Sequence, residues 1–336
     1  MTRSRGVVLG SSVLVAAGGL AATAVFFLAP ARASVGPLPA EALVLPPETG
    51  FVAGLDMKRF AASPFYQRYG RRGAAAHPEA FSELEDRTGI NPERDLDLVL
   101  LAGDKGRPRE DSAELLVVGN FDREKVGRAI AARPGVTTQS AQGTTVYVFD
   151  DARKTPKAAA FLDARSLVLG SPTRVQALVD AHARGDSKLR DNAELMQLLA
   201  KLRPGATFWM VGDQSLLAQL PQSLGGSRGD GASLTLPALQ ALTVTGDLDP
   251  DLSVQATGFT GDEAAAKNLA DIVRGFAAIA SMQAAQRPEL RSLTTAFNVT
   301  SEAKEVHVNL QLPYSVLDAL QPKAATPTSP PDPRAH

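Results

Sequence analysis

An internal repeat constrains this chain more than any other feature. Residues 45–64 (LPPETGFVAGLDMKRFAASP) align without gaps on residues 202–221 (LRPGATFWMVGDQSLLAQLP). The identical pairs are Leu45/Leu202, Pro47/Pro204, Phe51/Phe208, Asp56/Asp213, Ala61/Ala218 and Pro64/Pro221. Ordinary composition would give about one or two such identities. Further matches follow in the same order, such as 98–104 (LVLLAGD) with 241–247 (ALTVTGD). The pattern predicts a duplicated structural unit.

Each copy has the pattern of an α+β fold. An apolar strand runs into a short helix, then come a strand hairpin, a longer helix, two more strands and a last helix. Short turns between strands indicate antiparallel pairing, and helices that follow hairpins indicate one helical layer. We therefore expect two repeated units of antiparallel sheet with helices packed on one face. The first repeat spans 45–184 and the second 191–320, and a helix over 192–201 joins them.

The long helix of the second repeat has a stripe of apolar residues at helical spacing. Leu269, Ile272, Val273, Phe276 and Ile279 form this stripe. Such spacing is typical of a helix that packs on a core.

The strands of the two repeats differ in their patterns. In the second repeat, apolar and polar residues alternate strictly through 252–257 and 306–312, which indicates one buried and one solvated face. In the first repeat, 98–101 and 115–118 are apolar on both faces. We therefore expect the first sheet to be covered by the other repeat, by a helix near 79–87, or by an envelope protein partner, and the second sheet to be open to solvent.

The first 33 residues have the pattern of a targeting segment. Arg3 and Arg5 precede an uncharged run over 6–30, and Ala31-Arg32-Ala33 offers small residues for cleavage. The run predicts either a signal peptide or an N-terminal membrane anchor, with the rest of the chain outside the cytoplasm. Residues 322–336 are Pro-rich and predict a disordered tail.

Composition excludes several classes of function. The net charge of −1 offers no basic field for nucleic acid, and aromatic residues make up only 5% of the chain. The absence of cysteine excludes disulfides, a thiol nucleophile and Cys-ligated zinc. We expect no cofactor.

Several segments resemble a group of exported bacterial hypothetical proteins with no established activity. They are LPPETGFVAGLD from residue 45, SPFYQRY from 63, FSELEDRTGINPERDLDLVLL from 81, GNFDREKV from 119 and FLDARSLVLGSPTRVQALVDA from 161. The resemblance covers about Leu45 to Leu320. It implies a fold and an extracytoplasmic location, and it supplies no catalytic residues.

The repeated aspartates are the first candidate site. Asp56 and Asp213 each follow a strand and precede a helix, which predicts two structural N-caps. The alternative is a catalytic pair or a metal site, if the two copies face each other. Alternate carboxylates at Asp247, Asp249 and Asp251 resemble a calcium loop. Leu252 stands where such a loop needs glycine, so a hairpin turn is the better interpretation.

The histidines and the known catalytic motifs give no reactive centre. His77, His182, His307 and His336 have no metal-ligand spacing, and no P-loop or nucleophile elbow is present. The polar face of the second repeat is a possible binding face for a polar ligand or glycan; the alternative is an ordinary solvated sheet. It comprises Thr243, Thr245, Ser253, Gln255, Thr257, His307, Asn309 and Gln311.

These observations favour a non-enzymatic extracytoplasmic scaffold or binding module of the bacterial envelope, in the periplasm or anchored in the inner membrane. The alternatives are a hydrolase that uses the repeated aspartates and a carrier of an apolar ligand.

Overall fold

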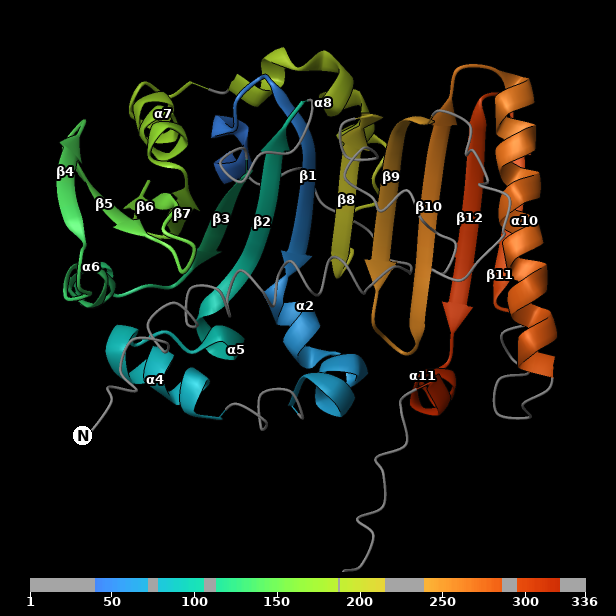
Figure 1. Ribbon diagram of the computed structural model, residues 1–336, viewed down its shortest axis with the longest axis horizontal. Helices are drawn as coiled ribbons and strands as arrows, with labels where there is room; N and C mark the ends of the chain where they lie inside the picture. The colour runs from blue at the N-terminus through green and yellow to red at the C-terminus, as the bar shows by residue number, and fades with distance from the viewer. Residues whose placement is uncertain are drawn as a thin grey trace, which may run out of the picture.

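A single antiparallel sheet of twelve strands organises the molecule (Figure 1). The computed structural model describes residues 40–71, 78–105, 113–186, 188–214, 239–285 and 295–320. The strands are β1 (Thr49–Asp56), β2 (Leu96–Asp104), β3 (Ala113–Gly119), β4 (Thr137–Ala141), β5 (Thr144–Asp150), β6 (Pro156–Phe161), β7 (Ser166–Gly170), β8 (Phe208–Asp213), β9 (Leu239–Asp247), β10 (Leu252–Thr260), β11 (Phe297–Glu302) and β12 (Glu305–Leu312). The helices are η1 (Ala40–Val44), α2 (Met57–Ala62), η2 (Tyr66–Gly70), α4 (Pro78–Thr88), α5 (Pro92–Asp95), α6 (Arg123–Ala131), α7 (Pro172–Ala183), η3 (Lys188–Asp191), α8 (Ala193–Ala200), α10 (Glu263–Ala285) and α11 (Tyr314–Leu320).

The strand order reads the same way outward from the centre of the sheet. From β1 it runs β2, β3, β7, β6, and from the neighbouring β8 it runs β9, β10, β12, β11. The β5–β4 hairpin extends the first half beyond this shared order. The antiparallel pair of β1 and β8 joins the halves, with Ala53 opposite Met210. The expected two sheets are therefore one continuous sheet, because β1 and β8, the first strands of the two halves, pair edge to edge through backbone hydrogen bonds.

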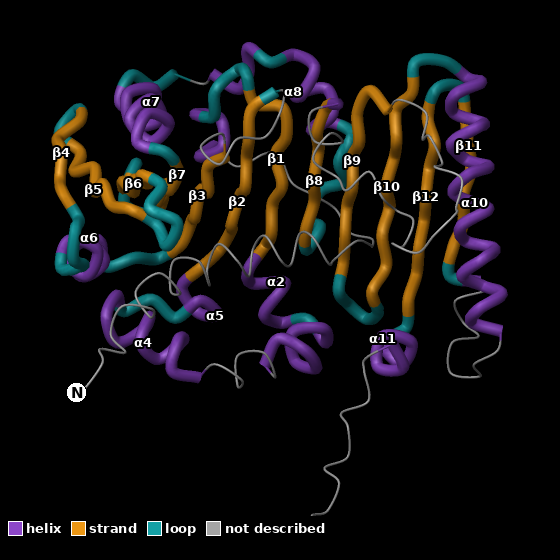
Figure 2. The backbone as a smooth tube through the Cα atoms, viewed as in Figure 1, coloured by secondary structure: helices purple, strands orange, loops and turns teal. Residues whose placement is uncertain are grey.

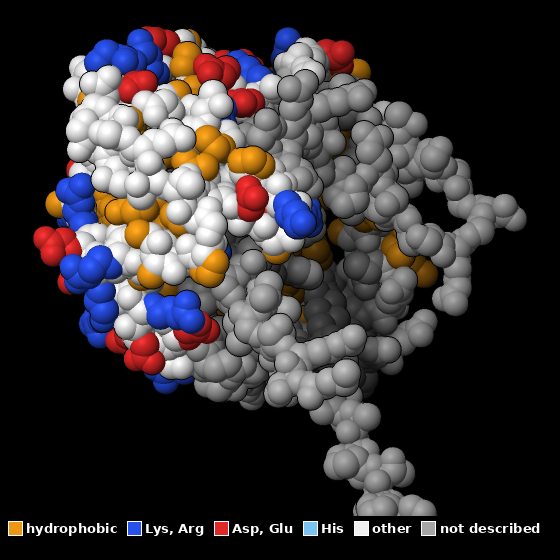
Figure 3. Space-filling view, turned by 60° about the vertical axis from the view of Figure 1, so that its left-hand side comes forward, with side chains coloured by type: hydrophobic (Ala, Val, Ile, Leu, Met, Phe, Trp, Pro, Cys, Tyr) orange, Lys and Arg blue, Asp and Glu red, His pale blue; other side chains and the backbone are white. Residues whose placement is uncertain are grey.

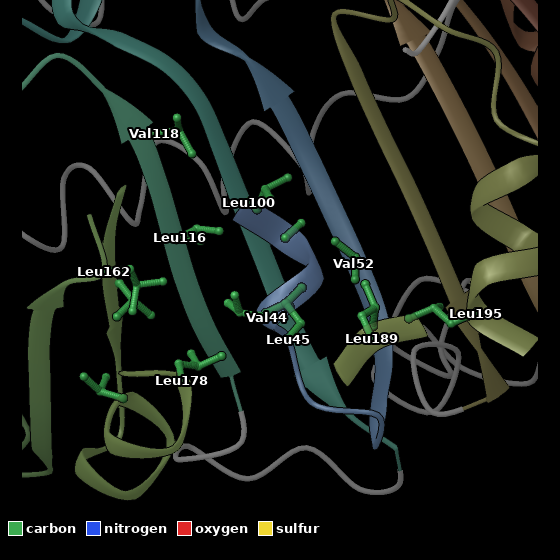
Figure 4. Close-up of a cluster of buried hydrophobic side chains, with 14 of the residues drawn as sticks. Val44, Leu45, Val52, Leu100, Leu116, Val118, Leu162, Leu178, Leu189 and Leu195 are labelled. Atoms are coloured by element: carbon green, nitrogen blue, oxygen red, sulfur yellow. The ribbon is translucent and has the colours of Figure 1, made fainter. Parts of the chain in front are cut away.

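One face of the first half is covered by α7, η1, η3 and α8. Val175 and Leu178 of α7 pack in a single cluster with Leu116 and Val118 of β3. The same cluster takes in Leu195 of α8, Leu189 of η3 and Val52 of β1 (Figure 4). Apolar residues on this face of the strands are thus covered by helices of the same chain.

The opposite face of the first half is covered by α6. Val126 and Ile130 of α6 pack in one cluster with Val117 of β3. Val117 and Val118 are neighbours in one strand, so their side chains point to opposite faces. The expectation of helices on one face is therefore wrong for the first half. Both apolar faces have helical covers within the chain, and neither requires a partner protein.

In the second half, α10 packs on the same face of the sheet as α6. Ala266, Leu269 and Ala270 of α10 cluster with Val306 of β12. When the strand pairings are followed from β3 to β12, the side chains of Val117 and Val306 lie on the same face of the sheet. Figure 1 shows α10 at the edge of the sheet, beside β11 and β12.

The helices α2, α4, α5 and α11 gather at one end of the strands (Figure 2). Tyr69, in η2 after α2, donates its hydroxyl to Asp318 of α11 at 2.7 Å. Around the β4–β5 side, acidic and basic side chains are interspersed on the surface rather than gathered by sign (Figure 3).

Candidate functional site

The second half of the sheet carries a regular array of uncharged polar side chains on the face opposite α10. Strand side chains alternate between faces, and this alternation places Thr257 and His307 on one face while Gly258 and Val306 point to the other. The paired residues form two rows across the strands, which we call the polar lattice. One row is Thr243, Thr257, His307 and Thr300, and the next is Thr245, Gln255, Asn309 and Asn298, with Ser253 and Gln311 paired beyond them.

Hydrogen bonds between strands hold the lattice side chains in place. Gln255 Nε2 donates to Asn309 Oδ1 at 3.0 Å. Thr257 Oγ1 and His307 Nδ1 lie 3.1 Å apart. Because neighbouring strands are about 4.8 Å apart, such pairs present donors and acceptors at regular intervals.

Exposure increases across the lattice from β9 to β11. Thr243 and Thr245 on β9 are buried, with 7% and 6% exposure. Gln255, His307 and Asn309 are half-buried, whereas Asn298, Thr300 and Gln311 are exposed. A shallow hollow of about 200 Å³ lies at this open side, lined by Ser253, Val254, Thr295, Ala296, Asn298, Asn309, Leu310 and Gln311.

Among the described residues, the charged groups near the lattice lie at its two ends. At one end, Lys201 Nζ lies 2.8 Å from Glu305, whose other oxygen is 3.7 Å from His307 Nε2. At the other end, Thr207 Oγ1 donates to Asp247 at 2.6 Å, and burial raises the pKa of Asp247. The row of Thr245, Gln255, Asn309 and Asn298 therefore offers neutral hydrogen-bonding groups, which can hold a ligand.

The repeated aspartates do not meet. Asp56 lies at the N-cap of α2, where its carboxylate accepts from the Arg59 N–H at 2.9 Å. Asp213 ends β8 at the opposite end of the antiparallel β1–β8 pair. Six residues of extended strand separate the two positions, a distance of about 20 Å. The helix expected after Asp213 lies outside the described residues.

The carboxylates between β9 and β10 belong to a hairpin turn. β9 and β10 pair directly on both sides of residues 248–251, with Ser253 opposite Asp247. Tyr314 donates its hydroxyl to the Leu248 carbonyl at 2.6 Å, which ties this turn to α11. Within the described residues, no group of three or more histidine, aspartate or glutamate side chains is placed to hold a metal ion.

The histidines are dispersed. His182 lies on α7 and His307 in the polar lattice, on opposite halves of the sheet. His77 and His336 lie outside the described residues, as do the N-terminal run and the Pro-rich tail. Among the described helices, none is both long and apolar enough to cross a bilayer.

A buried ion pair is the feature that sequence analysis missed. Glu114 of β3 has 1% exposure, and both its oxygens accept from the guanidinium of Arg174 on α7, with Nη2 at 2.7 Å from Oε1. Arg174 Nη1 also lies 2.5 Å from Asp104. The sequence did contain a signal for this pair, because a glutamate stands directly before the apolar run 115–118. A charge buried in a core must be paired, so this position implies a cationic partner.

Comparisons with known proteins give only a distant structural likeness. No protein family and no curated protein matches the chain. Among solved structures, crystal form I of TP0453 has 12% sequence identity and a TM-score of 0.47, and covers 85% of this chain and 96% of its own. Crystal form IV has 11% identity and a TM-score of 0.46 over the same shares. The strands and helices of the chain itself make it an α+β protein built on a large antiparallel sheet.

Proposed function

We propose that this chain is a non-enzymatic binding module of the bacterial envelope, located outside the cytoplasm, which holds an uncharged polar ligand on its polar lattice. The observation that carries this proposal is the pair of cross-strand rows of neutral donors and acceptors on one sheet face. α8 packs on β1, β8 and β9, and the lattice becomes more exposed toward β11.

The chemistry of the lattice favours a glycan. Amide and hydroxyl side chains such as Gln255, Asn309 and Thr257 complement the hydroxyl and acetamido groups of a neutral sugar polymer. A charged ligand would lose its hydration without meeting an opposite charge in the middle of the lattice. A shallow, open site also suits one stretch of a polymer better than an enclosed small molecule.

The location outside the cytoplasm is supported by the N-terminal sequence. Arg3 and Arg5 before the apolar run over 6–30 would keep the amino end inside and direct the remainder outward. The resemblance to exported bacterial proteins points the same way.

We also infer that the two halves arose by duplication. The shared strand order outward from β1 and β8 supports this origin, as does the position of α6 and α10 on the same face. The repeated residues Phe51 and Phe208 lie in β1 and β8, the two strands that meet at the centre. Divergence after duplication would explain why only the second half has a polar face.

The two alternative functions have less support. A hydrolase that uses Asp56 and Asp213 together would need them within one site, and they lie at opposite ends of the β1–β8 pair. A carrier would need an apolar cavity. One hollow among the described residues lies on the lattice and is lined by residues such as Asn298, Asn309 and Gln311, and another, beside α6, is lined by polar and charged residues such as Arg123, Glu124 and Arg128.

Binding to insoluble polysaccharides tests the proposal. The purified full chain is mixed with chitin, a neutral polymer of N-acetylglucosamine, and with a neutral β-glucan, and the bound fraction is measured after sedimentation. We expect retention on at least one of them. The variant Gln255→Leu should reduce retention roughly tenfold, because a side chain that hydrogen-bonds a ligand typically contributes about 1.5 kcal/mol.

Gln139→Leu is the matched control. Gln139 is an exposed glutamine on β4 of the same sheet, distant from the lattice in the strand order. Its variant should bind as the parent does. Equal retention of all three proteins, or retention of none on either polymer, would exclude the lattice as a glycan site.

A further inference from the structure

The outward face of α10 carries large apolar side chains that nothing in the described structure covers. Phe276 has 37% exposure, Ile279 55% and Met282 72%. They are the large hydrophobic residues that stand out as exposed among the described residues. Sequence periodicity assigned Phe276 and Ile279 to the core stripe, so their exposure is a correction to that prediction.

Helical geometry shows which side of α10 they occupy. Ala266 and Ala270 are fully buried against the sheet. Ile279 is nine residues beyond Ala270, about two and a half turns, and therefore points away from the sheet. Phe276 and Met282 flank Ile279 at three-residue spacing, so the three side chains form one patch, which we call the outer stripe.

The outer stripe lies on the second half of α10, and this helix is longer than the edge strand β11 beside it. α10 has 23 residues and is about 34 Å long, whereas β11 has 6 residues and spans about 20 Å. The first half of the helix is anchored on the sheet, where Ala266 and Leu269 pack with Val306 and Arg274 Nη2 donates to the Val299 carbonyl at 3.1 Å. The last turns of α10 therefore extend beyond the length of β11.

Charge is absent from this part of the helix. Ion pairs hold the first half: Glu263 with Lys267 at 2.7 Å, and Asp271 with Arg274 at 2.7 Å. From Gly275 to Ala285 the sequence is GFAAIASMQAA, without a charged residue. A helix face in water normally carries charged residues, so this stretch has the composition of a surface that becomes buried in an apolar environment.

The size of the stripe favours a lipid surface over a second protein. Three side chains exposed to these fractions present roughly 300 Å². A stable dimer buries about 800 Å² on each partner, so another copy of the chain would gain too little from this patch alone. A lipid surface has no such threshold, because a few apolar side chains can enter the boundary between head groups and acyl chains.

We propose that the outer stripe of α10 docks on a lipid surface. The proposal rests partly on the proposed location, because an N-terminal segment held in a membrane would keep α10 within reach of it. Since the stripe is uncharged and Arg274, the nearest cation of the described part of α10, is already paired with Asp271, the described residues give docking no need of an anionic lipid. It should depend on apolar insertion and be insensitive to salt.

The absence of cysteine makes a clean test possible. Ile279→Cys in the full chain is labelled with an environment-sensitive nitrobenzoxadiazole dye, and the protein is mixed with vesicles of phosphatidylcholine. We expect the emission to shift to the blue. Vesicles with brominated acyl chains should remove roughly half of the intensity, because the label then lies at the acyl boundary.

Asn268→Cys is the matched control. Asn268 is exposed on the same helix and lies eleven residues before Ile279, about three whole turns, so it shares the same side of α10 outside the stripe. Its label should remain in water with and without vesicles. Equal behaviour of the two labels would overturn the proposal.

Flotation of the vesicles separates the remaining outcomes. If the protein floats with the vesicles and the label at 279 stays in water, the docking proposal fails while the proposed membrane location survives. If the protein does not float, docking and a retained N-terminal anchor both fail, and only a location in the periplasm after cleavage of the N-terminal segment remains. A label at 279 that is blue-shifted before vesicles are added would mean that protein covers the stripe, and this also overturns docking.

Discussion

Arg174 and Glu114 meet through two parallel hydrogen bonds beneath α7, in the least solvated charged site among the described residues. Burial raises the pKa of Glu114 from 4.5 to about 7, and Arg174 opposes this rise while Asp104 and Glu48 add to it. A pKa that is higher in the folded state means that the folded protein binds the proton more tightly. The stabilisation is complete below the unfolded pKa of 4.5 and is lost as the pH rises through about 7.

We therefore expect the free energy of unfolding to fall between pH 5 and pH 8 relative to that of Glu114→Gln. The amide keeps the shape of the side chain and does not titrate, so titrations elsewhere in the chain cancel from the comparison. Urea denaturation of both proteins at several pH values measures the difference. A difference that stays constant over this range would show that Glu114 keeps one charge state throughout.

Asp56 shows the effect of a single cap. Its carboxylate accepts from the Arg59 N–H at the start of α2, and the exposed ion pair with the Arg59 side chain, at 3.6 Å, adds little. Asp56→Ala should lower the free energy of unfolding by about 1 kcal/mol, whereas Asp56→Asn, which keeps an acceptor, should cost much less. Thermal and urea unfolding of both variants test this. Equal losses would assign the effect to charge rather than to capping.

Among the elements, β3 and β12 should respond differently to the same substitution. Val118 of β3 is buried beneath α7, so Val118→Lys should destabilise the protein by several kcal/mol. Gln311 of β12 is exposed, and Gln311→Lys should change stability by no more than about 0.5 kcal/mol. Thermal melts with size-exclusion profiles compare them. Similar losses in the two variants would mean that the polar face is covered in solution.

Local patterns predicted elements better than they predicted contacts. The cap at Asp56, the hairpin of β9 and β10, and the connecting helix α8 follow from a few adjacent residues, and the structure has them. The pairing of β1 with β8 joins residues far apart in sequence, which no periodicity reports. Periodicity also identified the stripe of α10 without indicating that Phe276 and Ile279, at its far end, are exposed.

The candidate site was predictable to a similar degree. Strand alternation located the polar residues of β10 and β12 on one face, because side-chain direction alternates with residue number. The graded exposure from Thr243 to Gln311 depends on neighbouring strands and helices. The Glu114–Arg174 pair joins β3 to α7, so its partner could not be chosen from many arginines by sequence alone.

For the whole molecule, the orientation of the chain is the decisive test of location. A reporter enzyme that is active only in the cytoplasm, fused after Leu320, should be inactive in bacterial cells, because Arg3 and Arg5 hold the amino end inside. A variant with both arginines replaced by glutamate is the control for orientation. Activity of the parent fusion would place the sheet in the cytoplasm and remove the basis for an envelope role.

The central position of β1 has a consequence for the time course of assembly. β1 ends at Asp56, yet its neighbour β8 begins only at Phe208, so the ribosome needs on the order of ten seconds or more to make the intervening chain. During that interval the strands of the first half can pair with one another, while the edge of β1 that later pairs with β8 has no partner. Bare strand edges invite pairing with other chains. A pause in synthesis before Phe208 would lengthen this vulnerable period, and a holding chaperone that shields β1 would be most useful then.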